Sequence, residues 1–336
     1  MAAVILSLFP ACLGAAQKSA SPQTPPLRSA TELVKLDTSV LDQRGKFVAG
    51  LTARDFRVLD DGIEQPIAFF APVQTPAQIL VVLETSPAVY LIEKEHIAAA
   101  YALLDGLAPN DRVALATYDA IPHGVLGFTE DKSALLAALS QVQYTIGMAE
   151  LNLYDSISTV LDWLGPSAGK KALVLLSTGL DSSPPSRWDA LVAKLRREDV
   201  VIFPVALGGS LRGEPGRNSK PRRKSSKRDG KQNLGSPPAA DSEIFAKGDA
   251  ALLSLASMTG GRAYFPKSAN DFVPIYRQIA YELRNEYVLG IQPAQDGEFH
   301  SLKVEVIAND GKSSVSHFNA PAYQIFVRAG YLAPKP

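Results

Sequence analysis

The chain has 336 residues, of which 46% are hydrophobic, so it is long enough for one large domain or two small ones with cores of their own. Its 34 basic and 34 acidic residues balance, so no global field selects nucleic acid or a membrane surface. The single cysteine, Cys12, excludes an intramolecular disulfide.

The first 16 residues form an apolar run that is too short to span a bilayer. Small residues close this run at positions 14–16, which predicts a signal peptide over residues 1–16 and cleavage before Gln17. We therefore expect a secreted or periplasmic bacterial protein whose mature chain has no transmembrane segment. Two alternatives stay open: a buried N-terminal helix, and a lipoprotein modified at Cys12.

Residues 17–30 are rich in Pro and Ser and are expected to form a linker. Short strand-like runs follow over residues 31–75, which we assign to the N-terminal part of a small β domain. Asp60, Asp61 and Gly62 separate two of these runs and predict a hairpin turn. Thr52 is placed to cap a single helical turn.

From residue 76 to residue 288 the pattern changes to alternating strands and helices. Uninterrupted aliphatic runs predict strands that are buried on both faces of a sheet, and apolar residues at i, i+3 and i+4 predict helices. The expected strands are 79–84, 111–118, an antiparallel partner at 123–129, 171–177, 200–207 and 261–265. The expected helices are 91–107, 132–142, 153–164, 187–199, 249–258 and 271–287.

Strand-like runs return near the end of the chain, at residues 287–293, 300–308 and 323–332, with a turn at 309–311. We expect residues 289–336 to complete the β domain that residues 31–75 begin. The predicted fold is therefore α/β: a doubly wound, mostly parallel sheet, with a small antiparallel β domain built from both chain ends.

A segment over residues 208–241 has almost no apolar residues and carries nine basic residues against three acids, a net charge of +6. Such a composition cannot bury a core, so we assign a basic disordered insertion over residues 208–247. It is either a solvated linker or an arm that binds an anionic polymer or lipid. The candidate anion-binding residues are Arg222, Arg223, Lys224, Lys227 and Arg228.

Several motifs together resemble secreted bacterial proteins that carry a von Willebrand factor type A-related domain of the acidobacterial type. The sequence has, in family order, LTARDFRVLDDGIEQPIAFF, DRVALATYD, LYDSI, ALVLLSTGLDSS, SMTGGRAYF, ELRNEYVLGI and VRAGYLA. The resemblance covers nearly the whole mature chain. It implies a Rossmann-like type A domain beside a small β domain, and a binding module instead of an enzyme.

The resemblance also implies a metal-ion-dependent adhesion site, which holds Mg²⁺ through an Asp-x-Ser-x-Ser run, a Thr and a further Asp. The corresponding positions here are Glu84, Ser86, Ala88, Leu151 and Thr178. Three of these departures remove an oxygen ligand and one lengthens the acid, so we interpret the site as a relic and expect no metal cofactor. A slip of one or two residues at Leu151 would bring in Glu150 or Asn152, which keeps Mg²⁺ as the alternative.

We therefore expect a non-enzymatic module that contacts a protein partner through the upper rim of the sheet, independently of metal. The expected contact residues are Glu84, Thr85, Ser86, Thr178 and Asp181. The alternative is an electrostatic tether through residues 208–241. The four histidines show no metal-ligand spacing and no nucleophile elbow is present, so we expect no catalytic site and no small-molecule substrate.

Overall fold

The computed structural model describes residues 33–72, 76–90, 93–145, 150–165, 169–207, 239–307 and 323–335. The expected signal peptide, the linker 17–30, the turn 309–311 and residues 208–238 of the basic insertion lie outside the described residues. None of the described helices is long and apolar enough to cross a membrane.

A mostly parallel sheet of five strands forms the α/β part of the described chain, with the strand order β7-β6-β5-β8-β9. Its strands are β5 (Ala77–Glu84), β6 (Arg112–Tyr118), β7 (Pro122–Thr129), β8 (Lys170–Ser177) and β9 (Val201–Ala206). All pairs are parallel except β6 with β7, as the sequence predicted for residues 123–129. The doubly wound fold class is confirmed.

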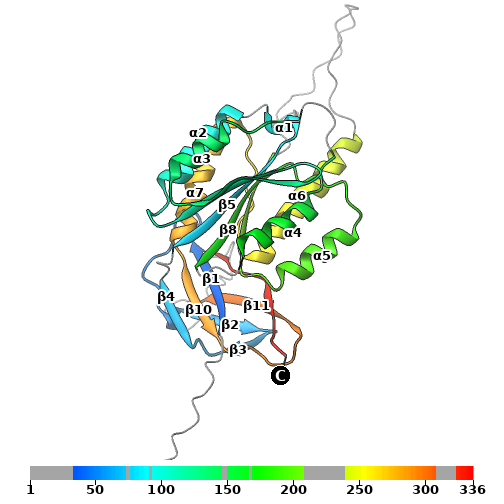
Figure 1. Ribbon diagram of the computed structural model, residues 1–336. Helices are drawn as coiled ribbons and strands as arrows, with labels where there is room; N and C mark the ends of the chain where they lie inside the picture. The colour runs from blue at the N-terminus through cyan, green and yellow to red at the C-terminus, as the bar shows by residue number, and fades with distance from the viewer. Residues whose placement is uncertain are drawn as a thin grey trace, which may run out of the picture. The chain divides into compact units, whose positions relative to one another are not determined.

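Helices cover both faces of this sheet (Figure 1). They are α1 (Pro87–Tyr90), α2 (Glu93–Asp105), α3 (Lys132–Leu139), α4 (Leu153–Leu164), α5 (Ser186–Leu195), α6 (Ala239–Thr259) and α7 (Phe272–Arg284), with a short 3₁₀ turn, η2 (Ala269–Asp271). Successive residues of β5 point to opposite faces: Ile79 and Val81 pack with α2, α3 and α7, whereas Leu80 and Val82 pack with α4, α5 and α6. This two-sided burial explains the unbroken aliphatic runs.

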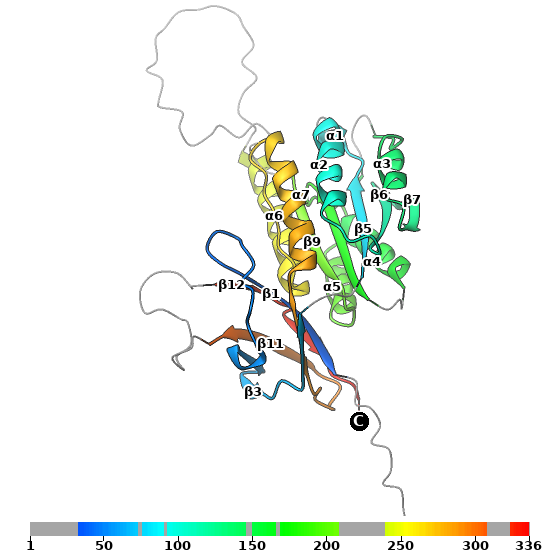
Figure 2. The same ribbon diagram turned by 90° about the vertical axis from the view of Figure 1, so that its left-hand side faces the viewer.

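Strands from both ends of the chain form two further antiparallel sheets, ordered β12-β1-β10-β4 and β13-β11-β2-β3. Their bounds are β1 (Val34–Leu41), β2 (Phe56–Asp60), β3 (Ile63–Gln65), β4 (Phe69–Pro72), β10 (Tyr287–Ile291), β11 (Phe299–Val306), β12 (Gln324–Phe326) and β13 (Gly330–Leu332). The blue strand β1 and the red end of the chain lie side by side in Figure 2, and β1 pairs with β12. One apolar core contains side chains from both sheets, among them Leu36, Phe56 and Val304.

The two local predictions in the N-terminal β region are confirmed. Asp61 and Gly62 connect β2 to β3 with φ values of 47° and 82°, the left-handed conformation that a two-residue hairpin loop of this kind requires. Thr52 precedes a 3₁₀ turn, η1 (Ala53–Asp55), and its backbone N–H donates to the Asp55 carboxylate at 2.7 Å.

Three element predictions are wrong. The strand expected over 323–332 is divided into β12 and β13, which belong to different sheets. The helix expected over 249–258 begins at Ala239, so residues 239–247, which the sequence predicts to be part of the insertion, are helical. Two alanines and the ion pair of Glu243 with Lys247 favour this early start. The strand expected over 261–265 is a single bridge between Val205 and Tyr264, because Pro266 cannot donate a ladder hydrogen bond.

Candidate functional site at the carboxyl ends of β5, β6 and β8

Three strands of the parallel sheet end at one place. Glu84 closes β5, Tyr118 closes β6 and Ser177 closes β8, and β5 lies between the other two. After β5 the chain forms β6 on one side of β5 and later β8 on its other side. The carboxyl end of β5 is therefore the point where the strand order reverses. Doubly wound sheets place ligand sites outside the carboxyl ends of their strands at such a point.

The Glu84 carboxylate is completely buried and is enclosed by hydrogen-bond donors from β6 and β8. Its Oε2 accepts hydrogen bonds from the Thr178 backbone N–H at 2.8 Å and the Thr178 hydroxyl at 2.8 Å. The same oxygen lies 3.0 Å from the Tyr118 hydroxyl and 3.2 Å from the Ser177 hydroxyl. Hydrogen-bond donors of the protein therefore occupy the Glu84 carboxylate, which a metal ion at this position would need as a ligand.

The hydroxyls around Glu84 also bind one another. Tyr118 and Ser177 are 2.7 Å apart through their hydroxyl oxygens, and Ser177 Oγ accepts the Gly179 backbone N–H at 2.8 Å. Burial, followed by the nearby Glu84 charge, raises the pKa of Tyr118 well above its usual range, so this hydroxyl keeps its proton and remains a donor. The cluster is a closed polar network inside the sheet edge.

The other positions of the implied metal site offer few oxygens. Leu151 is buried, and its backbone N–H and C=O both pair with Ser182. Ser86 Oγ is buried and has no hydrogen-bond partner among the described residues. Ala88 has no side-chain oxygen.

Nearby acids and amides serve local structure. Asp181 accepts the Tyr154 backbone N–H at 2.9 Å, which caps the first turn of α4, and the Ser183 N–H at 2.7 Å. Asn152 donates to the Ala120 carbonyl at 2.8 Å. Glu150 is exposed.

These residues do not fit Mg²⁺, which requires several hard oxygens in octahedral geometry and gives up its waters reluctantly. Among the motif positions only Glu84 carries a carboxylate, and a cation there would have to displace the donors from Tyr118, Ser177 and Thr178. The hydroxyls that could coordinate a metal are already directed at this carboxylate.

Of the five expected contact residues, four are buried: Glu84, Thr85, Ser86 and Thr178. Asp181 is half-buried. A partner can touch this edge only through exposed side chains, so a contact at the rim has to use other residues than these four.

A groove of about 550 Å³ is lined by the loop after β8, α5 and α6, and Asp181 is one of its lining residues. We call it the rim groove; its lining includes Tyr154, Gly179, Leu180, Asp181, Trp188, Asp189, Ile244 and Lys247. The Tyr154 and Trp188 rings meet edge to face at 5.1 Å. Ile244 is 52% exposed although it is apolar. Sequence reasoning missed this groove because it assigned residues 239–247 to the insertion.

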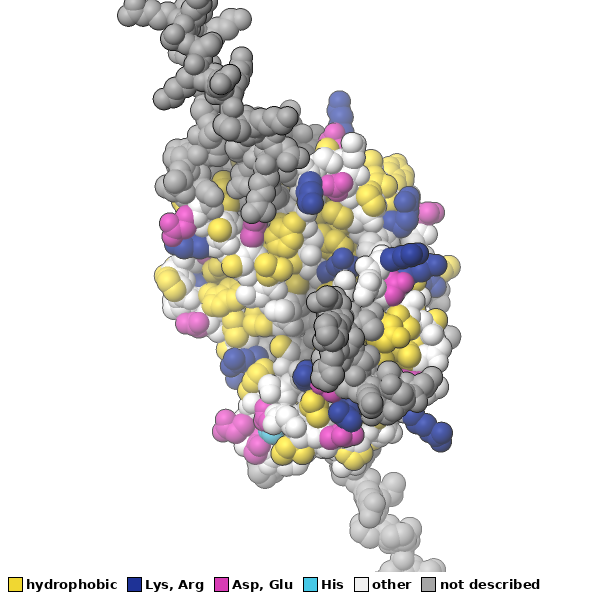
Figure 3. Space-filling view, turned by 180° about the vertical axis from the view of Figure 1, so that it is seen from behind, with side chains coloured by type: hydrophobic (Ala, Val, Ile, Leu, Met, Phe, Trp, Pro, Cys, Tyr) yellow, Lys and Arg dark blue, Asp and Glu magenta, His cyan; other side chains and the backbone are white. Residues whose placement is uncertain are grey.

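The candidate anion-binding residues Arg222, Arg223, Lys224, Lys227 and Arg228 lie outside the described residues. On the described surface seen in Figure 3, acidic and basic side chains are intermixed, and hydrophobic side chains gather on the upper half. That face of the described chain therefore presents no field of a single sign.

Neither a family model nor a curated protein matches this sequence. Solved structures do resemble it. A von Willebrand factor type A protein from Catenulispora acidiphila has 10% identity over 90% of this chain and 75% of its own, with a TM-score of 0.43. An aerotolerance-related membrane protein from Bacteroides fragilis NCTC 9343 has 12% identity over 61% of this chain and 99% of its own, with a TM-score of 0.43.

The vWF domain of the type V pili tip protein Mfa5 from Porphyromonas gingivalis has 22% identity, with a TM-score of 0.29. That match covers 32% of this chain and 40% of the pilus protein chain. The structures that resemble this chain thus include von Willebrand factor type A domains. At these identities and TM-scores, the likeness carries no information about partners or metal.

Proposed function

We propose that this chain is a non-enzymatic extracytoplasmic binding module of the von Willebrand type A kind, which contacts a protein partner at the rim without a bound metal. The observation that carries the proposal is the enclosure of Glu84. Its carboxylate meets protein donors on β6 and β8, so the position that would hold a metal is occupied by hydrogen bonds. In this proposal, side chains at the rim contact the partner directly, without a metal ion between them.

The rim groove supplies suitable side chains. Aromatic residues and exposed aliphatic residues in a concave site are typical anchors of protein interfaces, and the groove contains Tyr154, Trp188 and Ile244. Asp189 is exposed beside them. Because Asp189 and Lys247 give the groove charges of both signs, the partner that fits best is recognised by an apolar side chain.

The test is a pull-down from the native cell envelope, quantified by mass spectrometry, with and without chelator. Ile244→Glu places a charge in the groove, and Ile63→Glu is the matched control because Ile63 is also exposed but lies on β3. We expect the same partner with the parent, with chelator and with Ile63→Glu, and at least tenfold less with Ile244→Glu. Loss with chelator, or equal recovery with both variants, would refute a metal-independent contact at the groove.

The alternative is an electrostatic tether through residues 208–241, supported by their net charge of +6. Replacing the nine basic residues of this segment with Ser keeps the connection to α6 and changes the net charge of the segment from +6 to −3. A partner bound at the groove is retained by this variant. A polyanion or anionic lipid bound through the segment is lost, and its binding weakens with salt.

A further inference from the structure

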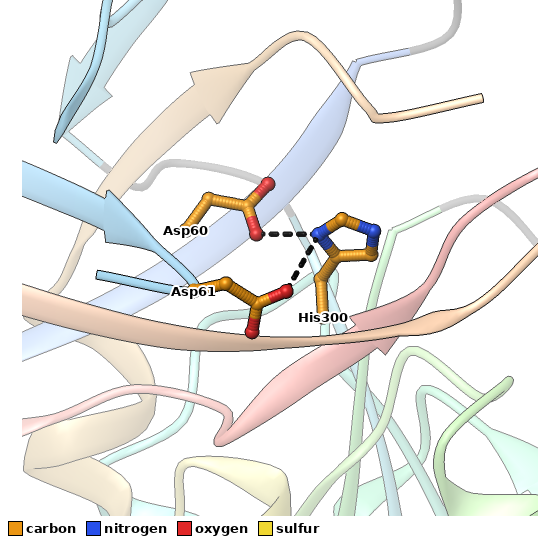
Figure 4. A group of neighbouring side chains, drawn as sticks. All are labelled: Asp60, Asp61 and His300. Atoms are coloured by element: carbon orange, nitrogen blue, oxygen red, sulfur yellow. Dashed lines mark hydrogen bonds and ion pairs between the residues drawn. The ribbon is translucent and has the colours of Figure 1, made fainter. Parts of the chain in front are cut away.

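One group of metal-ligating side chains in the described part of the chain lies away from the rim, in the β sheets. Asp60 and Asp61 stand at the turn between β2 and β3, and His300 stands near the start of β11, which pairs with β2. His300 Nδ1 is 2.8 Å from Asp60 Oδ1 and 3.2 Å from Asp61 Oδ2, and both carboxylates point toward the ring (Figure 4).

Each carboxylate is held in place through its other oxygen. The Tyr331 hydroxyl donates to Asp60 Oδ2 at 2.8 Å. The Ser301 backbone N–H and hydroxyl donate to Asp61 Oδ1 at 2.9 Å and 2.8 Å. One oxygen of each acid is therefore anchored, and the remaining one is free to face His300 Nδ1. Supporting hydrogen bonds of this kind orient the ligands in metal sites.

The second ring nitrogen of His300 has a carboxylate partner of its own, because Nε2 lies 2.9 Å from Asp296 Oδ2. A carboxylate only accepts, so Nε2 is the donor, which is the arrangement that fixes the tautomer of metal-bound histidines. Nδ1 then faces Asp60 and Asp61, which are also acceptors. His300 Nδ1, Asp60 Oδ1 and Asp61 Oδ2 can lie this close together only if a positive charge, either a proton on Nδ1 or a metal ion, lies between them.

The spacing suits a small transition-metal ion. Ligands at about 2.0–2.1 Å in a tetrahedron are about 3.3 Å apart. The distance from Nδ1 to Asp61 Oδ2 is 3.2 Å, and the distance of 2.8 Å from Nδ1 to Asp60 Oδ1 would have to lengthen by about 0.5 Å to admit the ion. One imidazole with two carboxylates matches Zn²⁺ and its neighbours, whereas Mg²⁺ and Ca²⁺ prefer oxygen ligands alone. Asp60 is buried but the Asp61 side chain is 50% exposed, so solvent reaches the group.

We propose that Asp60, Asp61 and His300 bind one divalent ion of the zinc class, with water in the remaining position. The ion would join the β2–β3 hairpin to β11, segments about 240 residues apart in the sequence. This site is independent of the proposed function at the rim. Spacing along the sequence indicated no histidine site, since the ligands meet only when the two chain ends pair.

The test is calorimetric titration of the metal-free full chain, without a polyhistidine tag, with Zn²⁺, followed by Co²⁺ absorption as a reporter of tetrahedral coordination. Asp61→Asn removes one charged ligand and preserves the turn, because Asn tolerates the φ of 47° at this position. His300→Gln removes the nitrogen ligand. The control is His123→Gln, since His123 is exposed and lies on β7.

We expect the parent and His123→Gln to bind one ion with the same affinity and to show tetrahedral Co²⁺ bands. Asp61→Asn should bind at least tenfold more weakly, and His300→Gln should lose the bands. No saturable binding by the parent would overturn the proposal. So would affinity that is unchanged in both Asp61→Asn and His300→Gln, which would place the ion elsewhere and leave His300 as a protonated bridge between acids.

Discussion

Glu286 is a buried acid between α7 and β10, and its carboxylate pairs with the Lys170 ammonium at the start of β8, which is also buried. Burial raises the pKa of Glu286 to about 7, and it does so against the opposing effect of Lys170. Asp37 and Lys35 on β1 also act on this group, in opposite directions. The paired acid thus resists ionisation although a cation lies beside it.

A raised pKa for Glu286 makes stability depend on pH with a definite sign. The contribution is fully present below about 4.5, the ordinary value, and is lost as the pH rises through about 7. Relative to Glu286→Gln, the parent should therefore lose stability over this window, by at most roughly 3 kcal/mol. Urea unfolding of both proteins at several pH values measures this difference.

Glu130→Gln is the control for the loss of one carboxyl group, because Glu130 is exposed. If the parent instead gained stability over Glu286→Gln as the pH rises from 4.5 to 7, the attraction of Lys170 would outweigh burial. The pKa of Glu286 would then lie below its ordinary value instead of above it.

Part of the Glu84 site could be predicted from the sequence. A strand that ends at Glu84 and another that ends just before Thr178 had to meet at one sheet edge, because parallel strands share their carboxyl ends. The roles of Tyr118 and Ser177 could not be predicted. Those contacts depend on the register that sets Glu84 opposite Tyr118, and on which way each hydroxyl turns.

At the scale of elements, α6 and the loop after β8 approach each other through two glycines. Gly179 has a φ of 75°, and a Cβ on Gly248 would lie 2.9 Å from the Thr178 carbonyl oxygen. The two backbones can meet this closely only without side chains. This contact fixes one wall of the rim groove beside the Glu84 network.

Gly248→Ala should therefore lower the free energy of unfolding by about 1–3 kcal/mol, even though Ala is otherwise favoured over Gly in a helix. Gly127→Ala is the matched control, because nothing lies within 4 Å of a Cβ there. Urea denaturation compares the two variants with the parent. A Gly248→Ala protein as stable as the parent would show that α6 can move away from the loop at no cost.

The start of α6 and the split of the last strand show where sequence patterns fail for elements. Residues 239–247 resemble the polar insertion in composition, and their helical state depends on the apolar helix that continues from them. The strand expected over 323–332 is divided into β12 and β13, because the chain between them crosses from one β sheet to the other. Arg328 there bridges Thr259 at the end of α6, a tertiary contact that local periodicity does not encode.

At the scale of the whole molecule, charged side chains gather at two separate places among the described residues. The rim has a buried acid enclosed by donors, and the β sheets have an acid pair that faces His300. The first does not fit Mg²⁺, and the second suits a zinc-class ion.

The most direct test of the central claim is the thermal melt of metal-free protein with and without millimolar Mg²⁺, for the parent and for Glu84→Gln. A site filled at 100 times its dissociation constant adds about 2.7 kcal/mol, and about 1 kcal/mol moves the midpoint of a domain of roughly 200 residues by some 2–4 °C. We predict that Mg²⁺ shifts neither protein by more than about 1 °C, because the Glu84 carboxylate is already enclosed by Tyr118, Ser177 and Thr178. A rise of several degrees in the parent that is absent from Glu84→Gln would show that the rim binds Mg²⁺ and would contradict the account.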